Sequence, residues 1–581
     1  MQVGCVVRVW PALRGVLILS PAVALVAAGV VFLVGQFDET DVPPPEDAGG
    51  RLVVVVVFDQ LRGDYLARWS SLFGPDGFEK LKAGGVWYSQ AHIPYAVTTT
   101  GPGHATLSTG LPPSRHGVVD NAWFDRARGK LTYCAAGDRA YDRVPSLGGA
   151  DSAAGGGQSP DRLLAPAVGD ALVAANRGRV FSLALKDRAA VLLGGKSPTG
   201  AFWFDAGSGQ FVTSGYYRDR LPPWAKDYNA GKPAERFAGR DWTRLLDPAV
   251  YDRHAGPDAG AGEGAANLFP HRVPAGAKTY DAVVASPAGN ELVWEFAQAA
   301  IDAEGLGQRG GTDLLLLGFS ANDYVGHAYG PDSQEVLDVT VRSDKLLAEV
   351  VAKLTEKLGA DRLSVVVSAD HGVCPLPERA LASHPEARRF DPVATYAPLN
   401  AVLDARFGAG DKPGQWVERL DFPWLYLNQR HLAARGLDRA AVEQVAADWA
   451  GHRPEVAEAA FPRSLLAGPP LTEPLARAAQ LSFHPDRCGD VYLLARPYTY
   501  PGGKLASGTT HGSPHPYDTH VPIVAFGVGV PKLGERPGRV SSLLVAPIVA
   551  HCLGLDPLPG RPERLPAEWT PAAVSSDTPA R

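Results

Sequence analysis

A threonine- and glycine-rich stretch contains the strongest candidate for a nucleophile. Thr98, Thr99 and Thr100 precede Gly101-Pro102-Gly103-His104, and a short apolar run with helical character follows. A hydroxyl group at a helix N-terminus lies beside backbone N–H groups and the positive end of the helix dipole, which together favour an anion. The pattern predicts a threonine that attacks an anionic substrate. Taken alone, the same residues also fit an ordinary helix cap.

Carboxylate and imidazole side chains follow three other apolar runs, and a further histidine lies in a glycine-rich loop. They are Asp59 after residues 51–58, Asp323 and His327 after residues 312–319, Asp370 and His371 after residues 363–368, and His511 in the loop 508–513. Carboxylate oxygen, imidazole nitrogen and a threonine alkoxide suit divalent ions, most of all Zn²⁺. The set therefore predicts two Zn²⁺ ions, an arrangement used for in-line phosphoryl displacement.

Two cations and an amide complete the set of polar side chains. Lys186 and Arg188 follow the apolar run 179–185, and alternation along an extended chain would point both to the same side. Together they would form a clamp for a dianion, in which arginine supplies a planar pair of donors. Asn121 follows Thr100 closely enough to return beside it, and its amide can hydrogen-bond a phosphoryl oxygen without adding charge.

The apolar runs before these side chains have the pattern of strands buried on both faces of a parallel sheet, because each is short, continuous and ends in a polar residue. They are residues 51–58, 179–185, 312–319 and 363–368. Residues 333–358 have the apolar periodicity of a crossover helix. The chain is therefore predicted to be an α/β protein with a mostly parallel central sheet flanked by helices, whose strands end at one ligand-binding edge.

The rest of the chain is expected to add strands, inserted caps and a tail to this core. The predicted parts are strands at 492–495 and 521–526, a last helix at 541–555, inserted cap segments at about 200–295 and 375–480, and a disordered tail at 566–581. High glycine and proline contents, 64 and 50 residues, favour long loops in the caps. The catalytic domain with its insertions would span residues 51–560.

The N-terminal segment is typical of an export signal. Residues 1–14 carry Arg8 and Arg14 without an acidic residue, residues 15–37 are almost wholly apolar, and residues 38–50 form an acidic, proline- and glycine-containing linker. The apolar segment is long enough to span a bilayer, so it fits either a cleaved signal peptide or a retained membrane anchor. The domain is therefore predicted to be exported to the periplasm or another extracytoplasmic compartment, with residues 1–14 as a cytoplasmic flank.

Charge and cysteine content restrict the partners further. The 581-residue chain has a net charge of −6 and no basic stripe, so nucleic acid is not an expected partner and a small, diffusible substrate is favoured. We expect a monomer. Four cysteines fall in the exported domain, where one or two disulfides could form, and their spacing fits no cysteine-based zinc site. They are Cys134, Cys374, Cys488 and Cys552.

The ordered motifs resemble the alkaline phosphatase superfamily, and within it the PafA-like branch with a threonine nucleophile, which is related to type I phosphodiesterases and nucleotide pyrophosphatases. The resemblance covers residues 51–555. It implies that one Zn²⁺ is held by Asp59, Thr100, Asp370 and His371, that the other is held by Asp323, His327 and His511, and that Asn121, Lys186 and Arg188 contact the phosphoryl oxygens. Thr100 is preferred to Thr98 and Thr99 because it directly precedes Gly-Pro-Gly-His. His515 and His520 lie near His511 in the sequence and are weaker candidates for supporting groups.

The resemblance implies a zinc-dependent phosphate monoester hydrolase that acts through a phosphothreonine on Thr100 and releases inorganic phosphate from small phosphorylated substrates. A monoester dianion carries one more charge than a diester, so Lys186 and Arg188 favour the monoester. A phosphodiesterase or nucleotide pyrophosphatase on the same bimetal core is the nearer alternative. Sulfatases resemble this core less, because their Cys/Ser-x-Pro-x-Arg motif does not occur in the sequence. A membrane-tethered binding protein with an inactive metal site is the more distant alternative, and the presence of every expected ligand argues against it.

Overall fold

The computed structural model describes residues 49–146, 157–264, 268–453, 457–502 and 507–569. All of them belong to one unit of the chain, Pro43–Arg581. The predicted export segment 1–37, most of the linker 38–50 and residues 570–581 of the predicted tail lie outside the described residues. Within the described ranges, no helix combines the length and apolarity that a membrane span requires.

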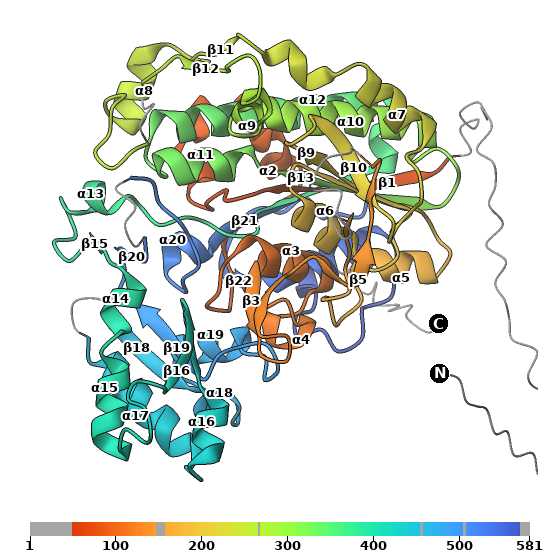
Figure 1. Cartoon of the computed structure of the whole chain (residues 1–581). Helices are drawn as coiled ribbons and strands as arrows, with labels where there is room; N and C mark the ends of the chain where they lie inside the picture. Colours follow the sequence, from red (N-terminus) through yellow and green to blue (C-terminus); the bar gives the residue numbers. More distant parts are fainter. Residues whose placement is uncertain (1–48, 147–156, 265–267, 454–456, 503–506, 570–581) are drawn as a thin grey trace, which may run out of the picture. The chain divides into compact units, whose positions relative to one another are not determined.

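A ten-stranded sheet forms the centre of the fold, with strand order β22-β2-β21-β14-β1-β13-β8-β9-β10-β6 (Figure 1). In that order the strands are Gly534–Ser541, Val86–His92, His520–Gly527, Leu363–Ser368, Arg51–Phe58, Thr312–Phe319, Val180–Ala184, Gly200–Asp205, Gln210–Ser214 and Arg143–Val144. The predicted strands 51–58, 312–319 and 363–368 are confirmed with the same bounds, and the one predicted at 179–185 is one residue shorter at each end.

The middle of the sheet is parallel, and its flanks contain antiparallel pairs. Strands β14, β1, β13, β8 and β9 run in parallel, with Val57 of β1 opposite Gly318 of β13 and Ser368 of β14. β21 and β10 pair antiparallel on either side of this group. The predicted α/β class is confirmed as a mixed sheet with flanking helices, and the parallel group brings the carboxyl ends of β14, β1, β13 and β8 to one edge.

Alternate side chains of β1 enter two different cores. Leu52, Val54, Val56 and Phe58 pack with one set of helices, whereas Val53, Val55 and Val57 pack with the other. This period of two follows from the strand geometry, because successive side chains point to opposite faces. Burying each of these aliphatic side chains contributes about 1.5–3 kcal/mol, which explains the continuous apolar run.

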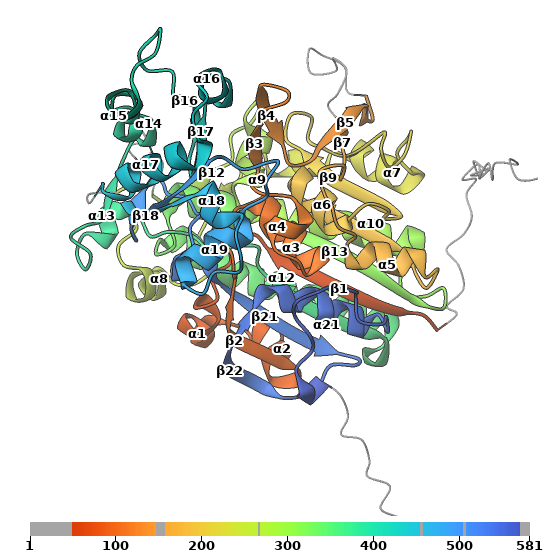
Figure 2. The same ribbon diagram turned by 90° about the horizontal axis from the view of Figure 1, so that it is seen from below.

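Helices cover both faces of the sheet (Figures 1 and 2). The face of Leu52 and Val54 packs against α2 (Phe78–Gly84), α7 (Pro223–Ala230), α9 (Thr279–Val284), α10 (Ala288–Glu304), α11 (Ala321–Tyr329) and α12 (Gln334–Leu358). The opposite face packs against α3 (Thr100–Thr109), α5 (Val168–Ala174), α6 (Asp187–Gly194) and α21 (Val545–Cys552). The predicted helix 333–358 is confirmed as α12, where the Ser333 hydroxyl accepts a hydrogen bond from Val336 N as the N-terminal cap.

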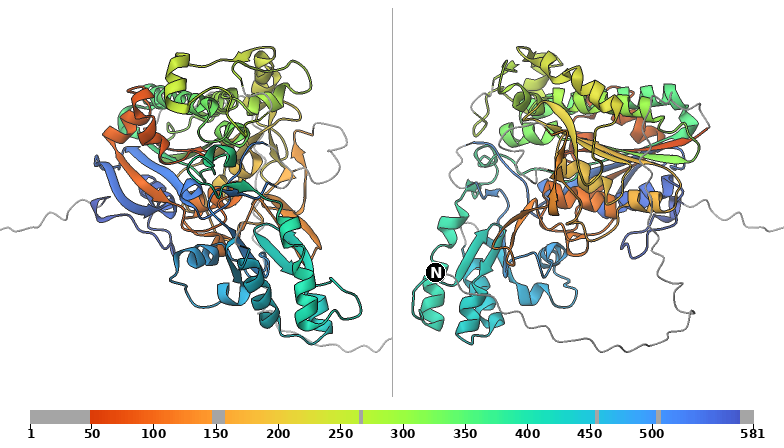
Figure 3. Two further views of the ribbon diagram at one scale, coloured as in Figure 1. Left: turned by 90° about the vertical axis from the view of Figure 1, so that its left-hand side faces the viewer. Right: turned by 45° about the vertical axis from the view of Figure 1, so that its right-hand side comes forward.

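The inserted segments differ from the expected boundaries. Residues 200–214 of the first predicted cap form β9 and β10 of the central sheet. The second segment builds a separate four-stranded antiparallel sheet, β16 (Val417–Asp421), β17 (Trp424–Leu427), β19 (Val491–Ala495) and β18 (Ala457–Pro462), which appears in teal and light blue in Figure 3. β19 therefore extends this insertion beyond residue 480. Of these strands, only residues 492–495 were predicted from local pattern, because strand pairing depends on residues far away in the chain.

The C-terminal tail and the cysteines also depart from expectation. Residues Ala567–Trp569 form a 3₁₀ turn, although disorder was predicted from residue 566. The reason is Trp569, which is 3% exposed and donates a hydrogen bond from its indole Nε1 to the Tyr88 hydroxyl at 2.7 Å. The four cysteines of the described residues, Cys134, Cys374, Cys488 and Cys552, are buried free thiols, so none of the disulfides considered above is present among them.

Candidate metal and phosphate site

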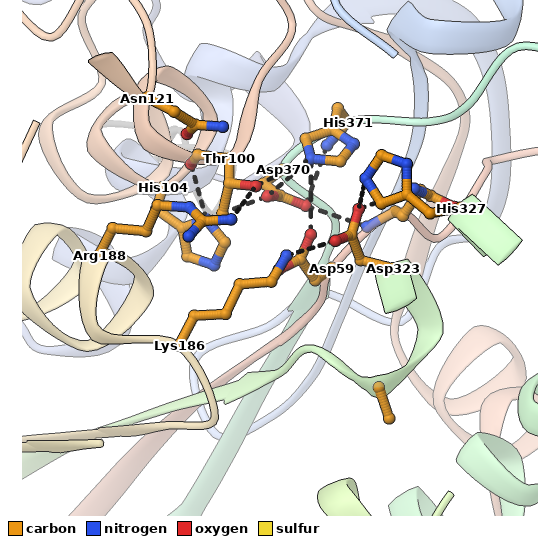
Figure 4. Close-up of polar contacts among 12 residues, drawn as sticks. Asp59, Thr100, His104, Asn121, Lys186, Arg188, Asp323, His327, Asp370 and His371 are labelled. Atoms are coloured by element: carbon orange, nitrogen blue, oxygen red, sulfur yellow. Dashed lines mark hydrogen bonds and ion pairs between the residues drawn. The ribbon is translucent and has the colours of Figure 1, made fainter. Parts of the chain in front are cut away.

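The site lies where neighbouring parallel strands end (Figure 4). Asp59 follows β1, Asp370 and His371 follow β14, Lys186 follows β8, and α11 begins after β13 and carries Asp323. These four strands are adjacent in the sheet in the order β14-β1-β13-β8. Four short peptide segments far apart in sequence are therefore delivered to one place by strand pairing alone.

One group of potential metal ligands surrounds Asp59. Oxygen or nitrogen atoms of Asp59, Asp370 and His371 lie within 4.8 Å of one another, and all three residues are buried. His371 Nε2 is 3.5 Å from Asp59 Oδ1, 3.3 Å from Asp370 Oδ2 and 3.4 Å from the Thr100 hydroxyl. The structure thus brings together the four residues that the resemblance assigns to one ion.

A second group surrounds Asp323. Its Oδ1 atom lies 3.2 Å from His327 Nε2 and 3.5 Å from His511 Nε2. The His511 ring stacks on that of His371, with ring centroids 3.5 Å apart, and His371 also comes within 4.8 Å of the Asp323 and His511 ligand atoms. His371 therefore lies between the two groups, whereas the resemblance implied a place in the Asp59 group alone.

Three imidazoles turn the same nitrogen toward the carboxylates. The Nδ1 atoms of His327, His371 and His511 lie 2.7, 2.9 and 2.8 Å from the backbone oxygens of Thr509, Gly372 and Thr98. Because a carbonyl oxygen only accepts, each Nδ1 carries a proton, and Nε2 is the ring nitrogen that faces the carboxylates. This orientation is typical of zinc-bound histidine, in which a carbonyl or carboxylate fixes the ring from behind.

The electrostatics of the carboxylates also fit a divalent cation. Burial, reinforced by the neighbouring Asp370 carboxylate, raises the pKa of Asp59 to about 7. Burial lowers the pKa of His371 to about 3, so this ring is neutral and able to act as a ligand. Both carboxylate oxygens of Asp59 and one of Asp370 lack a well-oriented hydrogen-bond donor among the described residues. The donor set, its tautomers and its cluster of three buried carboxylates therefore suit two metal ions.

Lys186 and Arg188 both reach the site, but by a route that differs from the prediction. Lys186 ends the extended segment and is the N-terminal flank of α6, whereas Arg188 already lies in the first turn of that helix. The Lys186 ammonium group is 2.8 Å from Asp59 Oδ2 and also contacts Asp323 Oδ2, and Arg188 Nη2 is 3.4 Å from the Thr100 hydroxyl. Alternation along a strand therefore does not explain their shared direction; the strand-to-helix turn does.

Thr100 is the first residue of α3, with Thr99 in extended conformation before it. Asn121 Oδ1 accepts a hydrogen bond of 2.7 Å from Gly101 N, which fixes the side-chain amide beside the start of this helix. Because Oδ1 already accepts from Gly101 N, the amide is oriented, and its Nδ2 group is the end that can donate a hydrogen bond to a ligand. Asp120 supports the same loop, because its Oδ1 accepts from the Thr99 hydroxyl at 2.9 Å and from Asn121 N.

Two further residues of the site were not assigned a role from sequence. Gln60 directly follows Asp59, and His104 closes the Gly-Pro-Gly-His motif. His104 is fully buried, with Nδ1 2.9 Å from the Thr100 carbonyl oxygen and 3.1 Å from Asp370 Oδ2. Gly103 permits this close approach, since a Cβ there would lie 2.4 Å from the Asp370 carbonyl oxygen. Their adjacency to motif residues was the available signal, but Gln60 contacts Asp323 and Asp370, and His104 contacts Asp370, all more than 260 positions away.

The two weaker histidine candidates face elsewhere. His515 Nε2 lies 2.9 Å from the Ala495 carbonyl oxygen, and His520 Nε2 lies 2.8 Å from that of Ser89, with its ring stacked on His92. Neither residue belongs to a group of potential metal ligands found among the described residues. They support the strand β21 and the loop before it.

Comparisons with known proteins agree with this geometry. The model of the family "Type I phosphodiesterase / nucleotide pyrophosphatase" matches residues 53–518, and the chain belongs to that family. Within the alkaline phosphatase superfamily the chain is PafA-like. It is 32% identical over 524 residues to alkaline phosphatase PhoV of Synechococcus elongatus, covering 88% of this chain and 92% of PhoV.

Alkaline phosphatase PafA of Elizabethkingia meningoseptica is similar over the same part of the chain. The two sequences are 31% identical over 516 residues, which cover 87% of this chain and 92% of PafA. The crystal structure of wild-type PafA superposes with a TM-score of 0.79, covering 89% of this chain and 97% of that structure at 31% identity. The resemblance and the fold inferred from the sequence are therefore confirmed.

Proposed function

We propose that this protein is a zinc-dependent phosphate monoester hydrolase that acts through a covalent phosphothreonine on Thr100. Its relatives PhoV and PafA, which it matches over most of their length, are named alkaline phosphatases. The observation that carries the proposal is the convergence of Lys186 and Arg188 with the Thr100 hydroxyl and the two carboxylate groups. One cation beside a hydroxyl at a helix N-terminus, with a second on the adjoining Asp59 and Asp323 carboxylates, suits a phosphate dianion.

Asp59, Thr100, Asp370 and His371 would hold one Zn²⁺, and Asp323, His327 and His511 would hold the other. Bound zinc lowers the pKa of a coordinated hydroxyl group and neutralises negative charge that develops on phosphoryl and leaving-group oxygens.

The chain's own residues then perform a double displacement. The Thr100 oxygen forms a bond to phosphorus while the bond from phosphorus to the leaving oxygen breaks. Water subsequently attacks the phosphothreonine, which regenerates the Thr100 hydroxyl and releases phosphate. Arg188 lies 3.4 Å from the attacking oxygen, and the free Nδ2 end of Asn121 lies at the same helix start. Both can donate to the equatorial phosphoryl oxygens, where charge accumulates in the transition state.

The description of the matched family favours one other activity, hydrolysis of phosphodiesters or nucleotide pyrophosphates. The two activities differ in the charge of the group that is transferred. A hydrogen bond to a charged group contributes about 1.5–3 kcal/mol. Removing both cations should therefore lower kcat/KM for a monoester by roughly 10²–10⁴-fold and affect a diester much less.

The test compares p-nitrophenyl phosphate with bis-p-nitrophenyl phosphate, using the purified full-length protein loaded with zinc. The site variant carries Lys186→Ala and Arg188→Ala. A matched control carries Lys232→Ala and Arg236→Ala, which also removes one lysine and one arginine but from ion pairs with Glu235 and Glu295 outside the site. Each protein is assayed with and without a zinc chelator.

We expect the wild type to prefer the monoester by several orders of magnitude and to lose activity with chelator. The site variant should lose monoester activity selectively, whereas the control should retain it. Preference for the diester would move the function to the phosphodiesterase alternative. Equal losses on both substrates in the site variant would refute the role assigned to the two cations, and inactivity of the wild type on both would favour the binding-protein alternative.

We also propose that the protein is exported and acts as a monomer on small phosphorylated substrates outside the cytoplasm. The support is the apolar segment 15–37 between a basic flank and an acidic linker. Cell fractionation with an N-terminal mass measurement distinguishes a cleaved signal peptide from a retained membrane anchor. A retained anchor leaves the intact N-terminus in the membrane fraction. Light scattering of the purified protein measures the oligomeric state.

A further inference from the structure

Gln60 contacts a carboxylate of each predicted metal group. Its side-chain Nε2 donates a hydrogen bond of 2.7 Å to Asp323 Oδ1, and its backbone N donates one of 3.1 Å to Asp370 Oδ1. The residue is 3% exposed. Because a carboxylate only accepts, the contact with Asp323 also fixes which end of the amide faces it.

The backbone of Gln60 adopts an unusual conformation to make both contacts. Its φ angle is +70°, in the left-handed region that residues other than glycine rarely occupy. Such a conformation costs free energy and persists only where surrounding contacts hold it, often at functional sites. Here the contacts that hold it are the bonds to Asp323 and Asp370.

The helix that carries Asp323 and His327 leaves room for this glutamine. Gly326 lies between those two residues in α11, and a Cβ atom at this position would lie 1.7 Å from Gln60 Oε1. Alanine is otherwise preferred to glycine inside a helix. The glycine is therefore explained by the amide packed against it.

The two hydrogen bonds have different effects on the two carboxylates. Asp370 Oδ1 receives Gln60 N and His371 N, both at 3.1 Å, so its other oxygen is turned toward His371 Nε2. Asp323 Oδ1 receives the Gln60 amide while it also faces His327 and His511. Gln60 thus sets the orientation of one carboxylate in each group.

We infer that Gln60 is a positioning residue that couples the two zinc sites, with Gly326 as the residue that admits its side chain. The inference rests on the proposed function, since it assumes that the two groups bind zinc. Loss of the amide leaves Lys186 on Asp323 Oδ2 but removes the donor that holds Asp323 Oδ1 toward His327 and His511. Loss of the strained backbone displaces the Gln60 N–H from Asp370. Both sites should then bind zinc more weakly.

The experiment measures zinc affinity of the full-length protein by competition with a chromophoric chelator, and counts the ions per chain by elemental analysis. Gln60→Ala removes the amide and keeps the strain, whereas Gln60→Gly removes the amide and relieves the strain. The matched control is Gln334→Ala, because Gln334 is also a buried glutamine whose amide donates to a carboxylate, that of Asp252 at 3.0 Å, outside the site. Thermal unfolding of the zinc-free forms reports on folding separately.

We expect both Gln60 variants to lose roughly 10–100-fold in zinc affinity, the range typical of residues that orient metal ligands, and the control to bind zinc like the wild type. Wild-type zinc affinity in Gln60→Gly would overturn the inference and leave the proposed function intact. A wild-type protein that binds no zinc would overturn the metal requirement of the proposed function as well. An equal loss in the Gln334 control would show that the effect comes from general destabilisation and would also overturn the inference.

Gly326→Ala provides an independent test. Helix propensity alone predicts that this change stabilises α11, whereas the clash with Gln60 predicts weaker zinc binding. In a double-mutant cycle, Gly326→Ala should lower zinc affinity in the wild type but have little further effect in Gln60→Gly, since the clashing side chain is then absent. Additive losses would contradict the coupling.

Discussion

Replacing His104 with phenylalanine should weaken zinc binding by roughly 10–100-fold while the protein still folds. The His104 ring is fully buried, and its Nδ1 lies between the Thr100 carbonyl oxygen and Asp370 Oδ2, at 2.9 and 3.1 Å. Phenylalanine keeps an aromatic ring at this position but has no N–H group. An N–H group this close to a buried carboxylate contributes about as much as a hydrogen bond to a charged group, about 1.5–3 kcal/mol. This corresponds to roughly one to two powers of ten in affinity.

His116→Phe is the matched control for this change. His116 is also a fully buried histidine beside α3, where its Nε2 lies 3.1 Å from the Thr106 hydroxyl and its Nδ1 accepts from Val118 N. Burial lowers the pKa of His116 to about 3, so these are neutral hydrogen bonds with no link to the metal groups. Their loss should cost about 0.5–1.5 kcal/mol each in the free energy of unfolding, without a change in zinc affinity.

Chelator competition measures zinc affinity for the three proteins, and urea unfolding of the zinc-free forms measures stability. The expected pattern is a selective loss of zinc affinity in His104→Phe and a selective loss of stability in His116→Phe. If both variants lost zinc affinity equally, the effect would stem from disturbed packing around α3, and the role of His104 in holding Asp370 would be refuted.

Three further predictions concern the nucleophile, the tail and a buried acid. Thr100→Ala should lower monoester turnover by several orders of magnitude and abolish the phosphorylated enzyme that mass spectrometry detects after acid quenching. Thr100→Ser should retain that phosphorylated enzyme. A phosphorylated Thr100→Ala protein would contradict the assignment of the nucleophile. Trp569→Ala should lower the free energy of unfolding by about 3–5 kcal/mol, because it removes a buried indole and its hydrogen bond to Tyr88. The kcat should stay unchanged. An unchanged unfolding midpoint in urea would show that Trp569 contributes nothing to stability. Burial raises the pKa of Asp120 to about 6. The folded protein therefore holds this proton more tightly than the unfolded chain does. For that reason Asp120 should lower the free energy of unfolding as the pH rises from about 4 to about 6. Asp120→Asn should flatten that part of the stability profile, and an identical profile would refute the shift.

The chemistry proposed for the site rests on residues in short runs of sequence. Asp59, Asp323 and Asp370 each follow a continuous apolar strand, and parallel strands of one sheet end at the same edge. Residue type then limits the reaction, since carboxylates, imidazoles and a hydroxyl group suit divalent ions and phosphoryl transfer. These inferences need only local pattern and ligand chemistry.

Other features depended on which distant residues meet. The segment at 200–214 joins the central sheet and β19 joins the small one, because each strand pairs with whichever partner buries its side chains. The single indole of Trp569 orders a segment whose composition predicted disorder. Arg188 reaches Thr100 through the start of α6, although the sequence suggested an extended chain.

The sequence by itself therefore determined the class of fold, the strands that carry chemistry and the types of side chain available. Only the tertiary structure placed His371 between the two carboxylate groups, aligned the three Nε2 atoms and brought Gln60 and His104 onto Asp323 and Asp370. The physical reason is that orientation arises from hydrogen bonds between residues far apart in the chain, such as His327 with Thr509 and His511 with Thr98, which are 182 and 413 positions apart. Local sequence carries no record of those partners until the sheet assembles.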